Sequence, residues 1–384
     1  MGLVERRDLV PDEKILSEIF PAAVELRLAS CQVMSKTFDT CTSSIRDDPT
    51  LHPGYPPDVI IRLETSRARL AAVAALQHLA HAQLSDLVPR VLHVGSATTT
   101  DARQVEYTVS TYCTGKVPLE GVWNTLDKTH QLELVDSVVH AMEKLQTLSI
   151  NNMGHLQLLS NSIGGPRFGY FRDVKHFLDG ITQASNHTST TCKLLDIEGG
   201  VALESIYDDT DRVELSHADL QDLRHHTVLC HNDLEPRNIL VKTISSPEGK
   251  GKYYQVASLI DWEMSGFYPF TYKFSLNDTV LGSSNLSFSW YALFKERTSF
   301  LLPRGECHTK FIRALRVIDG SSKRAMMRNV GVLFQTKWIK REQIETQDLR
   351  QGWARKHGTK APESFTEDDR ECLEQEVLSE LGYC

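Results

Sequence analysis

Glycine is absent from a long stretch near the start of this 384-residue sequence. The chain has 22 glycines, but none lies between Gly2 and Gly54. Glycine lets backbone N–H groups approach a phosphate closely, because no Cβ stands in the way. A glycine-rich phosphate loop is therefore excluded from this part of the chain.

Paired cysteines are also absent, because the sequence contains no C-x-x-C. The eight cysteines are scattered: Cys31, Cys41, Cys113, Cys192, Cys230, Cys307, Cys372 and Cys384. This spacing matches neither a zinc site nor a dense disulfide framework. We expect free thiols in a reducing compartment, and therefore a cytoplasmic protein.

Long apolar runs and basic runs are missing as well. No segment approaches the roughly 18 uninterrupted apolar residues of a membrane span, and the N-terminal residues lack the apolar core of a secretory signal. The net charge is −8 and Lys and Arg form no long run, which argues against a broad nucleic-acid-binding face. We therefore expect neither a membrane nor a nucleic-acid partner. The 41% of apolar residues predicts a sizeable core.

Strands are predicted in the first part of the chain and helices in most of the rest. Predicted strands lie at residues 56–64, from Val88 onward and at 104–112, with a helix at 66–82. Helical periodicity follows at 128–148, and residues 171–226 and the chain after the last strand are predicted to be mostly helical. Two strands, 237–243 and 253–260, are the only ones predicted in this second part. The charged tail is predicted to end in a surface helix capped by Thr366 or Ser364.

A polar loop separates the apolar runs "TVLC" and "NILV" in the stretch "LCHNDLEPRNILV", residues 229–241. Asp233 can accept a proton from a substrate hydroxyl, and Asn238 offers a neutral oxygen to a hard cation. The second strand ends in "SLIDWE", where Asp261 and Glu263 supply carboxylates on one side of a strand end. Phosphoryl transfer needs such groups, because it requires magnesium on the phosphates and a residue that orients the nucleophile. The alternative interpretation of Asp233 and Asn238 is an ordinary Asx-type turn.

The motifs "HNDLEPRNIL" and "LIDWEMSGFYP" resemble the catalytic and metal-binding loops of the aminoglycoside phosphotransferase and choline kinase-like group, in the form found in its fungal members. The resemblance covers roughly residues 56–300. It implies the two-lobed protein-kinase-like fold, of the α+β class. We therefore expect a small, mainly antiparallel N-terminal lobe at 1–113 and a larger, mostly helical C-terminal lobe with a helical tail at 114–384.

The resemblance also implies a role for each matching residue. Asp233 would be the catalytic base or would orient the substrate hydroxyl. Asn238 would bind Mg²⁺, Asp261 would be its principal ligand, and Glu263 would assist them. ATP would bind against the backbone between the lobes, and the residues expected there are Ser110, Thr111, Tyr112 and Cys113.

Three features of the N-terminal lobe depart from the family pattern. The Gly-rich loop would fall in residues 26–41, which offer only small residues in place of glycine. The strand lysine that holds the phosphates is replaced by Arg62, which keeps the charge but differs in reach and planarity. Arg62 has a second interpretation, as an ordinary surface arginine. The helix that would carry its Glu partner has Ala72 and Val73 near that position, so we expect this pair to be lost.

The sequence thus predicts an ATP- and Mg²⁺-dependent phosphotransferase that acts on a hydroxyl of a small polar metabolite. The alternative is a degenerate kinase-like protein that binds a ligand or partner, or that performs altered chemistry. Aromatic residues in "GFYPFTYKF" and "NLSFSWYALF" would suit a cationic acceptor if they faced it, but their simpler interpretation is helical core. Neither the acceptor nor an oligomeric state follows from the sequence.

Overall fold

The computed structural model describes residues 7–21, 31–46, 54–65, 69–152, 162–184, 186–207, 212–245 and 252–383. The chain forms two compact units, Met1–Leu119 with Arg237–Ser265 and Glu120–Pro236 with Gly266–Cys384. The segment 237–265 thus belongs to the first unit, although the predicted boundary after residue 113 assigned it to the second domain. The predicted boundary separates a nucleotide-binding lobe from a catalytic and substrate lobe. This functional division stays a prediction.

The first unit contains a five-stranded antiparallel sheet with the strand order β1-β2-β3-β5-β4. Its strands are β1 (Cys31–Lys36), β2 (Thr40–Ile45), β3 (Val59–Thr65), β4 (Val91–Thr98) and β5 (Gln104–Thr111), and its helices are α1 (Glu13–Ile19) and α2 (Leu70–Gln83). The three strands and the helix predicted in this region correspond to β3, β4, β5 and α2 and are confirmed. Val59, Ile61 and Leu63 are buried at alternate positions of β3, as expected for a strand with one face on the core.

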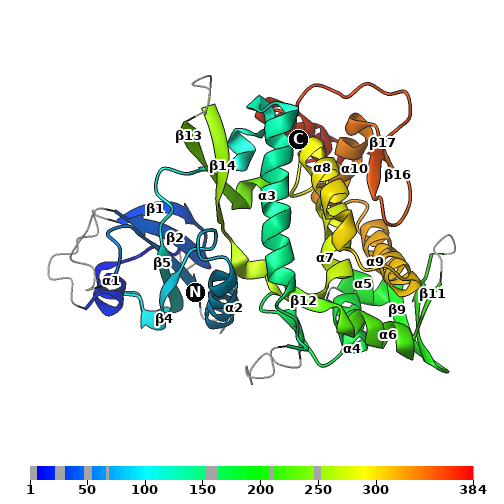
Figure 1. The fold of residues 1–384 in the computed structure, drawn as a ribbon, viewed down its shortest axis with the longest axis horizontal. Helices are drawn as coiled ribbons and strands as arrows, with labels where there is room; N and C mark the ends of the chain where they lie inside the picture. The colour runs from blue at the N-terminus through cyan, green and yellow to red at the C-terminus, as the bar shows by residue number, and fades with distance from the viewer. Residues whose placement is uncertain are drawn as a thin grey trace. The chain divides into compact units, whose positions relative to one another are not determined.

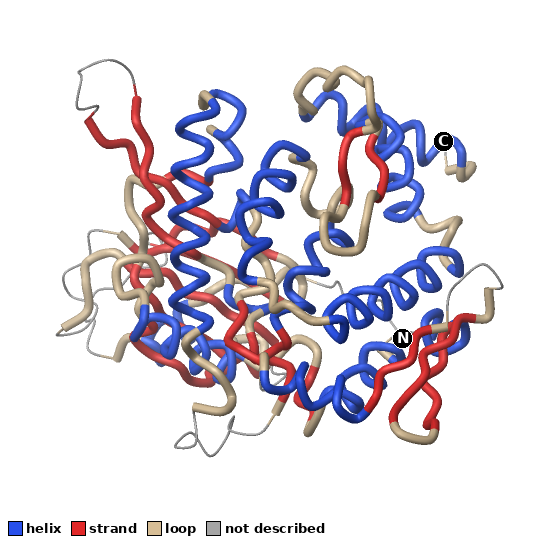
Figure 2. Tube along the Cα trace, turned by 45° about the vertical axis from the view of Figure 1, so that its right-hand side comes forward, coloured by secondary structure: helices blue, strands red, loops and turns tan. Residues whose placement is uncertain are grey.

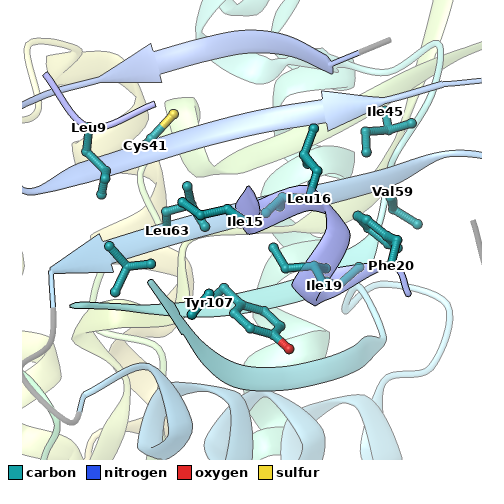
Figure 3. Close-up of a cluster of buried hydrophobic side chains, with 14 residues drawn as sticks. Leu9, Ile15, Leu16, Ile19, Phe20, Cys41, Ile45, Val59, Leu63 and Tyr107 are labelled. Carbon is teal, nitrogen blue, oxygen red and sulfur yellow. The ribbon is translucent and has the colours of Figure 1, made fainter. Parts of the chain in front are cut away.

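The helix α1 covers apolar side chains of this sheet (Figure 3). Ile15 and Ile19 of α1 belong to the same buried cluster as Leu63 of β3 and Tyr107 of β5. The helix begins after Asp12, whose carboxylate accepts a hydrogen bond of 2.8 Å from the N–H of Ile15, a typical N-cap.

A smaller sheet of the first unit contains the predicted hairpin (Figure 1). β13 (Ile239–Ser245) pairs with β14 (Lys252–Leu259) and, on its other edge, with β6 (Val117–Pro118). The N–H of Leu259 donates to the carbonyl of Leu87 at 2.7 Å, just beyond α2. The indole of Trp262 donates to the carbonyl of Leu259 at 3.0 Å. These bonds hold the end of β14 within the first unit.

Helices make up most of the second unit (Figure 2). They are α3 (Lys128–Gln146), α4 (Val174–Gln183), α5 (Asn186–Thr191), α6 (His217–His225), α7 (Phe270–Val280), α8 (Phe288–Thr298), α9 (Glu306–Ala325), α10 (Val330–Glu342) and α11 (Glu367–Glu380). The amphipathic helix predicted at 128–148 corresponds to α3. Thr366, one of the two predicted caps, begins α11 with a capping box to Asp369.

The prediction that only two strands follow the first lobe is wrong. The second unit contains a sheet of order β12-β15-β7-β8, a sheet of order β11-β10-β9, and the pair β16-β17. Their strands are β7 (Ile163–Gly165), β8 (Gly169–Phe171), β9 (Cys192–Ile197), β10 (Gly200–Ser205), β11 (Val213–Ser216), β12 (Thr227–Cys230), β15 (Gly266–Pro269), β16 (Ile344–Thr346) and β17 (Trp353–Arg355).

The missed sheet β9–β11 lies in the segment that was predicted to be mostly helical, beside α5 and α9 (Figure 1). The first four residues of β10 are all buried, so the strand shows no alternation that would distinguish it from a helix. Gly199, with φ of 84°, forms the turn before it. A Cβ at Gly200 would lie 2.1 Å from the carbonyl oxygen of Leu215, so the close strand pairing requires glycine there.

Two expectations from composition can be compared with the described residues. Their cysteines are all free thiols, as predicted. None of the described helices combines the length and the apolar character needed to cross a membrane.

Candidate active site

Asn238 and Asp261 lie at the same end of the β13–β14 hairpin. Ile239 and Leu259 are register partners in its two strands. Just beyond this pair, the N–H of Ile260 donates to the carbonyl of Asn238 at 3.0 Å, and Asp261 is the next residue. The hairpin thus brings an amide and a carboxylate, 23 residues apart in sequence, to one strand end. Both side chains offer the oxygen ligands that a hard cation prefers.

The backbone adopts the left-handed conformation at two positions of the site. One is Asp261, and the other is Asn232, the residue before Asp233. Asp261 has φ of 62° and ψ of 68°, in the left-handed region, and Asn232, which precedes Asp233, has φ of 67°. Among the described non-glycine residues only two others, Ala102 and Gln343, have positive φ. This conformation costs roughly 1 kcal/mol or more for most residues with a Cβ and less for Asp and Asn, and it persists where the surroundings fix it, often at functional sites.

Arg62 belongs to a network of ion pairs beside Asp261. Its guanidinium pairs with Glu263. Arg69, which precedes α2, pairs with Glu64 and lies 3.4 Å from the second carboxylate oxygen of Glu263. The side chain of Arg62 is 25% exposed and that of Glu64 only 3%. The interpretation of Arg62 as an ordinary surface arginine therefore does not describe its surroundings.

The predicted loss of the helix glutamate is confirmed, because α2 contains no carboxylate at all. The sequence analysis missed that Glu263 supplies a partner for Arg62 from the end of β14 instead. Burial lowers the pKa of Arg62, and the charges of Asp261 and then Glu64 oppose this change. Arg62 thus lies within the electrostatic field of the carboxylate that was predicted as the main metal ligand.

Asp233 follows β12 in the second unit. Its N–H donates to Nδ1 of the buried His231 at 3.2 Å, so His231 fixes the loop backbone. Lys273 of α7 is fully buried and donates to Oδ1 of Asn277 at 2.6 Å. Burial lowers the pKa of Lys273, whereas the negative charges of Glu235 and Asp233 raise it.

The sequence analysis missed Lys273 as a neighbour of this loop. The available signal was a lysine within the apolar and aromatic run "GFYPFTYKF", where a charge requires a partner. The aromatic side chains of that run and of "NLSFSWYALF" are buried: Phe267, Tyr268, Phe270, Tyr272, Phe274, Phe288, Trp290, Tyr291 and Phe294. Their interpretation as core is confirmed.

The segment predicted to contact ATP lies beside the hairpin. Ser110 and Thr111 end β5, and the N–H of Thr111 and of Tyr112 donate to carbonyls of the same unit at 3.0 and 3.2 Å. The thiol of Cys113 donates to the hydroxyl of Ser258 on β14 at 3.3 Å. Ser110–Cys113 and the strand leading to Asp261 are therefore brought together.

β1 and the β1–β2 turn occupy most of the described part of the region where the family pattern has a Gly-rich loop. The hydroxyl of Thr37 accepts hydrogen bonds from the N–H groups of Asp39 at 3.2 Å and Thr40 at 3.0 Å. The turn uses these donors internally and adds a carboxylate, so it is a poor phosphate cradle. Residues 26–30 of that region lie outside the described residues.

The sequence profile of APH, the phosphotransferase enzyme family, matches residues 59–276. The chain belongs to this family. The match includes both motifs, and with the architecture above it confirms an α+β, kinase-like phosphotransferase. No curated protein matches the chain.

Solved structures to which the chain is similar include three phosphotransferase complexes. The streptomycin–ATP complex of APH(2″)-IIa has 9% identity and a TM-score of 0.40, with 86% of this chain and 92% of that chain covered. ADP-bound APH(2″)-Ib has 10% identity and a TM-score of 0.41, with 97% of each chain covered. Spectinomycin phosphotransferase APH(9)-Ia, with ADP and its antibiotic, has 12% identity and a TM-score of 0.33, with 83% and 91% covered. At these TM-scores the likeness assigns no residue of the site.

Proposed function

We propose that the protein is an ATP- and Mg²⁺-dependent phosphotransferase that acts on a hydroxyl of a small polar metabolite. The observation that carries this proposal is the strained Asp261 at the strand end it shares with Asn238. A binding module with no use for a metal would gain stability by relaxing that backbone. The family membership supports the same conclusion.

Mg²⁺ fits the donors at the end of the hairpin. Asn238 and Asp261 would hold the ion through an amide and a carboxylate oxygen, and the ion would neutralise charge on the phosphates. The carboxylate of Glu263 is engaged by Arg62 and Arg69. We therefore propose that Glu263 mainly orients Arg62. The Mg²⁺ dependence of nucleotide binding in Glu263→Gln tests whether it is also a third metal ligand.

Arg62 suits the phosphates of ATP. Its Nε–H is buried and has no hydrogen-bond partner among the described residues, and a guanidinium can hold phosphate oxygens through two parallel bonds. The adenine would lie against Ser110–Cys113, beside β14. In the second unit Asp233 would accept the proton of the acceptor hydroxyl, with its loop fixed by His231.

We place the acceptor in a cavity of about 370 Å³ in the second unit. Pro236, three residues after Asp233, lines it together with Trp123 and Phe288. Carboxylates and guanidinium groups share the lining: Glu120, Glu342, Glu363, Glu367, Arg355 and Arg370. The volume is at the lower end for small-molecule sites, roughly 300–1,000 Å³, and the mixed charges favour a polar acceptor.

One observation favours the second candidate function, a degenerate kinase-like protein that binds a ligand or partner. The β1–β2 turn consumes its own N–H groups and carries Asp39, so an important part of the usual phosphate grip is missing. On this alternative the protein would bind without transferring a phosphate.

Two measurements test the proposal. ATP with Mg²⁺ should raise the thermal midpoint, because a ligand that binds only the folded state stabilises it. A screen of polar metabolites should then reveal an acceptor that triggers ADP release. In Asp233→Asn, ADP release should fall by roughly 10²–10⁴-fold while the thermal shift remains, and the exposed Asp368→Asn should behave as wild type. Absence of a metal-dependent shift would favour the binding module, and full turnover in Asp233→Asn would reject Asp233 as the base.

A further inference from the structure

A second group of metal-binding side chains lies in the second unit, where α6 packs against α9. In the described part of the chain, Asp222, Cys307 and His308 are the one group of at least three His, Cys, Asp or Glu whose ligand atoms all lie within 4.8 Å. Oδ2 of Asp222 is 2.8 Å from Sγ of Cys307 and 3.3 Å from Nε2 of His308. One carboxylate oxygen of Asp222 thus lies close to both the thiol of Cys307 and the imidazole of His308.

His308 is fully buried but only one of its ring nitrogens forms a hydrogen bond. Nδ1 is 2.6 Å from the hydroxyl of Thr271. Nε2 approaches Oδ2 of Asp222 to 3.3 Å, but without the geometry of a hydrogen bond, and it has no hydrogen-bond partner among the described residues. A buried polar atom without a partner requires an explanation, such as an ion. A histidine that binds a metal typically uses its other nitrogen for a hydrogen bond that fixes the ring, which is the arrangement found here.

We propose that Asp222, Cys307 and His308 bind a Zn²⁺ ion. A thiolate, an imidazole and a carboxylate are the donors that zinc takes in proteins, and three protein ligands leave one position of a tetrahedral site open. The carboxylate and a thiolate would balance the charge of the ion. The side chain of Asp222 is 45% exposed, so the open position would face solvent.

The surroundings of the three ligands are mixed in charge. The ring of His226 lies 5.0 Å from that of His308, and its Nδ1 is 3.6 Å from Oδ1 of Asp222. Burial lowers the pKa of His308, and the charges of His226 and Arg350 act in the same direction. The single negative charge of Asp222 would not offset the positive charges of Zn²⁺ and Arg350. Zinc binding therefore requires that Cys307 bind as a thiolate, which adds a second negative charge.

A nucleophilic role for Cys307 does not explain the cluster. Burial and the neighbouring Asp222 raise the pKa of the Cys307 thiol to about 12. Reactive cysteines instead lie in environments that lower their pKa. A bound metal reverses this effect, because its charge deprotonates a coordinating thiol.

Cysteine spacing predicted no zinc site, because a single cysteine contributes to this one. Cys307 and His308 are adjacent in the first turn of α9, and Asp222 lies 85 residues earlier. Only the packing of α9 against α6 and α7 brings Asp222, Thr271 and the α9 residues together.

Cobalt substitution in the full-length chain tests the proposal. After removal of metal with a chelator, one equivalent of Co²⁺ should produce a thiolate-to-cobalt charge-transfer band, and Zn²⁺ should displace it. Cys307→Ser should lose the band, whereas Cys372→Ser, which removes an exposed thiol, should keep it. Asp261→Ala should also keep it, because oxygen ligands give no such band, so this result is independent of the phosphotransferase proposal.

Two further variants cover the case in which Cys307→Ser does not fold. Asp222→Asn changes a half-exposed side chain and should weaken Co²⁺ binding more than the roughly 10–100-fold typical of an outer hydrogen-bond partner. Thr271→Val should weaken it within that range. Absence of the band in folded wild type, an unchanged band in Cys307→Ser, or unchanged Co²⁺ affinity in folded Asp222→Asn would each overturn the proposal.

Discussion

Glu263→Gln separates two roles for this carboxylate, because they predict different responses to Mg²⁺. Glu263 pairs with Arg62 and lies 3.4 Å from Arg69. If it orients Arg62 for the phosphates, its neutralisation should weaken nucleotide binding equally at every Mg²⁺ concentration. If it is a metal ligand, more Mg²⁺ should restore the binding. We expect the first result.

The structure sets the size of the stability change. Removing one partner of a fully buried ion pair costs about 3–5 kcal/mol, and an exposed pair contributes about 0–1 kcal/mol. The side chains of Arg62 and Glu263 are 25% and 20% exposed, so this pair lies between these limits. Glutamine keeps an acceptor oxygen. We therefore expect the free energy of unfolding to fall by about 1–2 kcal/mol, close to the lower range for hydrogen bonds to charged groups.

Urea denaturation and calorimetric titration with ATP test both expectations. In Glu263→Gln the nucleotide affinity should fall about tenfold, equivalent to about 1.4 kcal/mol, with an unchanged half-saturating Mg²⁺ concentration. As a matched control, Glu374→Gln breaks an exposed pair with Arg370 and should cost less than about 0.5 kcal/mol. A raised Mg²⁺ requirement with unchanged stability would show that Glu263 binds the metal and that the orienting role is wrong.

The other predictions concern the same strand end. Asp261→Ala should abolish Mg²⁺-dependent nucleotide binding and Asn238→Ala should weaken it less, because an anionic oxygen attracts Mg²⁺ more strongly than an amide; calorimetry with the order reversed would reject this metal site. Arg62→Ala should lose roughly 1.5–3 kcal/mol of nucleotide affinity and Arg62→Lys should recover only part of it, whereas equal affinities would make Arg62 a bystander. Asp261→Gly should be more stable to urea than Asp261→Ala by about 1 kcal/mol, because glycine relieves the left-handed backbone. At Glu371, an exposed residue of the helix α11, the Ala variant should instead be more stable than the Gly variant. An Ala variant that is more stable than the Gly variant at both positions would refute the strain at Asp261.

Local patterns predicted most of the strands that lead to the site. The β-branched run around Arg62 and the apolar runs that follow Asp233 and precede Asp261 are properties of short segments, and the structure contains β3 and the hairpin at these positions. The strand β12, which leads to Asp233, was not predicted. The strand β10 was missed because burial of consecutive residues removes the alternation that marks a strand.

Partnerships between distant residues could not be predicted from such patterns. Glu263 was assigned only to the metal, since nothing in its own segment indicates that it reaches Arg62, about 200 residues earlier. Likewise, no spacing rule connects Asp222 with Cys307. These pairings depend on which elements pack together, and that information is spread over the whole chain.

The position of Glu263 shows how the first unit would bind a nucleotide under the proposed function. In the family pattern the glutamate that orients the phosphate-binding residue lies on a helix, so a correct grip depends on where that helix sits. Here Glu263 follows Asp261 by two residues, at the end of a strand anchored by the bond between Leu259 and Leu87. The residue that positions Arg62 and the proposed metal ligand therefore share one short, fixed segment. A guanidinium can bind phosphate through two hydrogen bonds, which fix its orientation better than an ammonium's is fixed. The replacement of lysine by Arg62 and the relocation of the glutamate to Glu263 are therefore compatible changes rather than two independent losses.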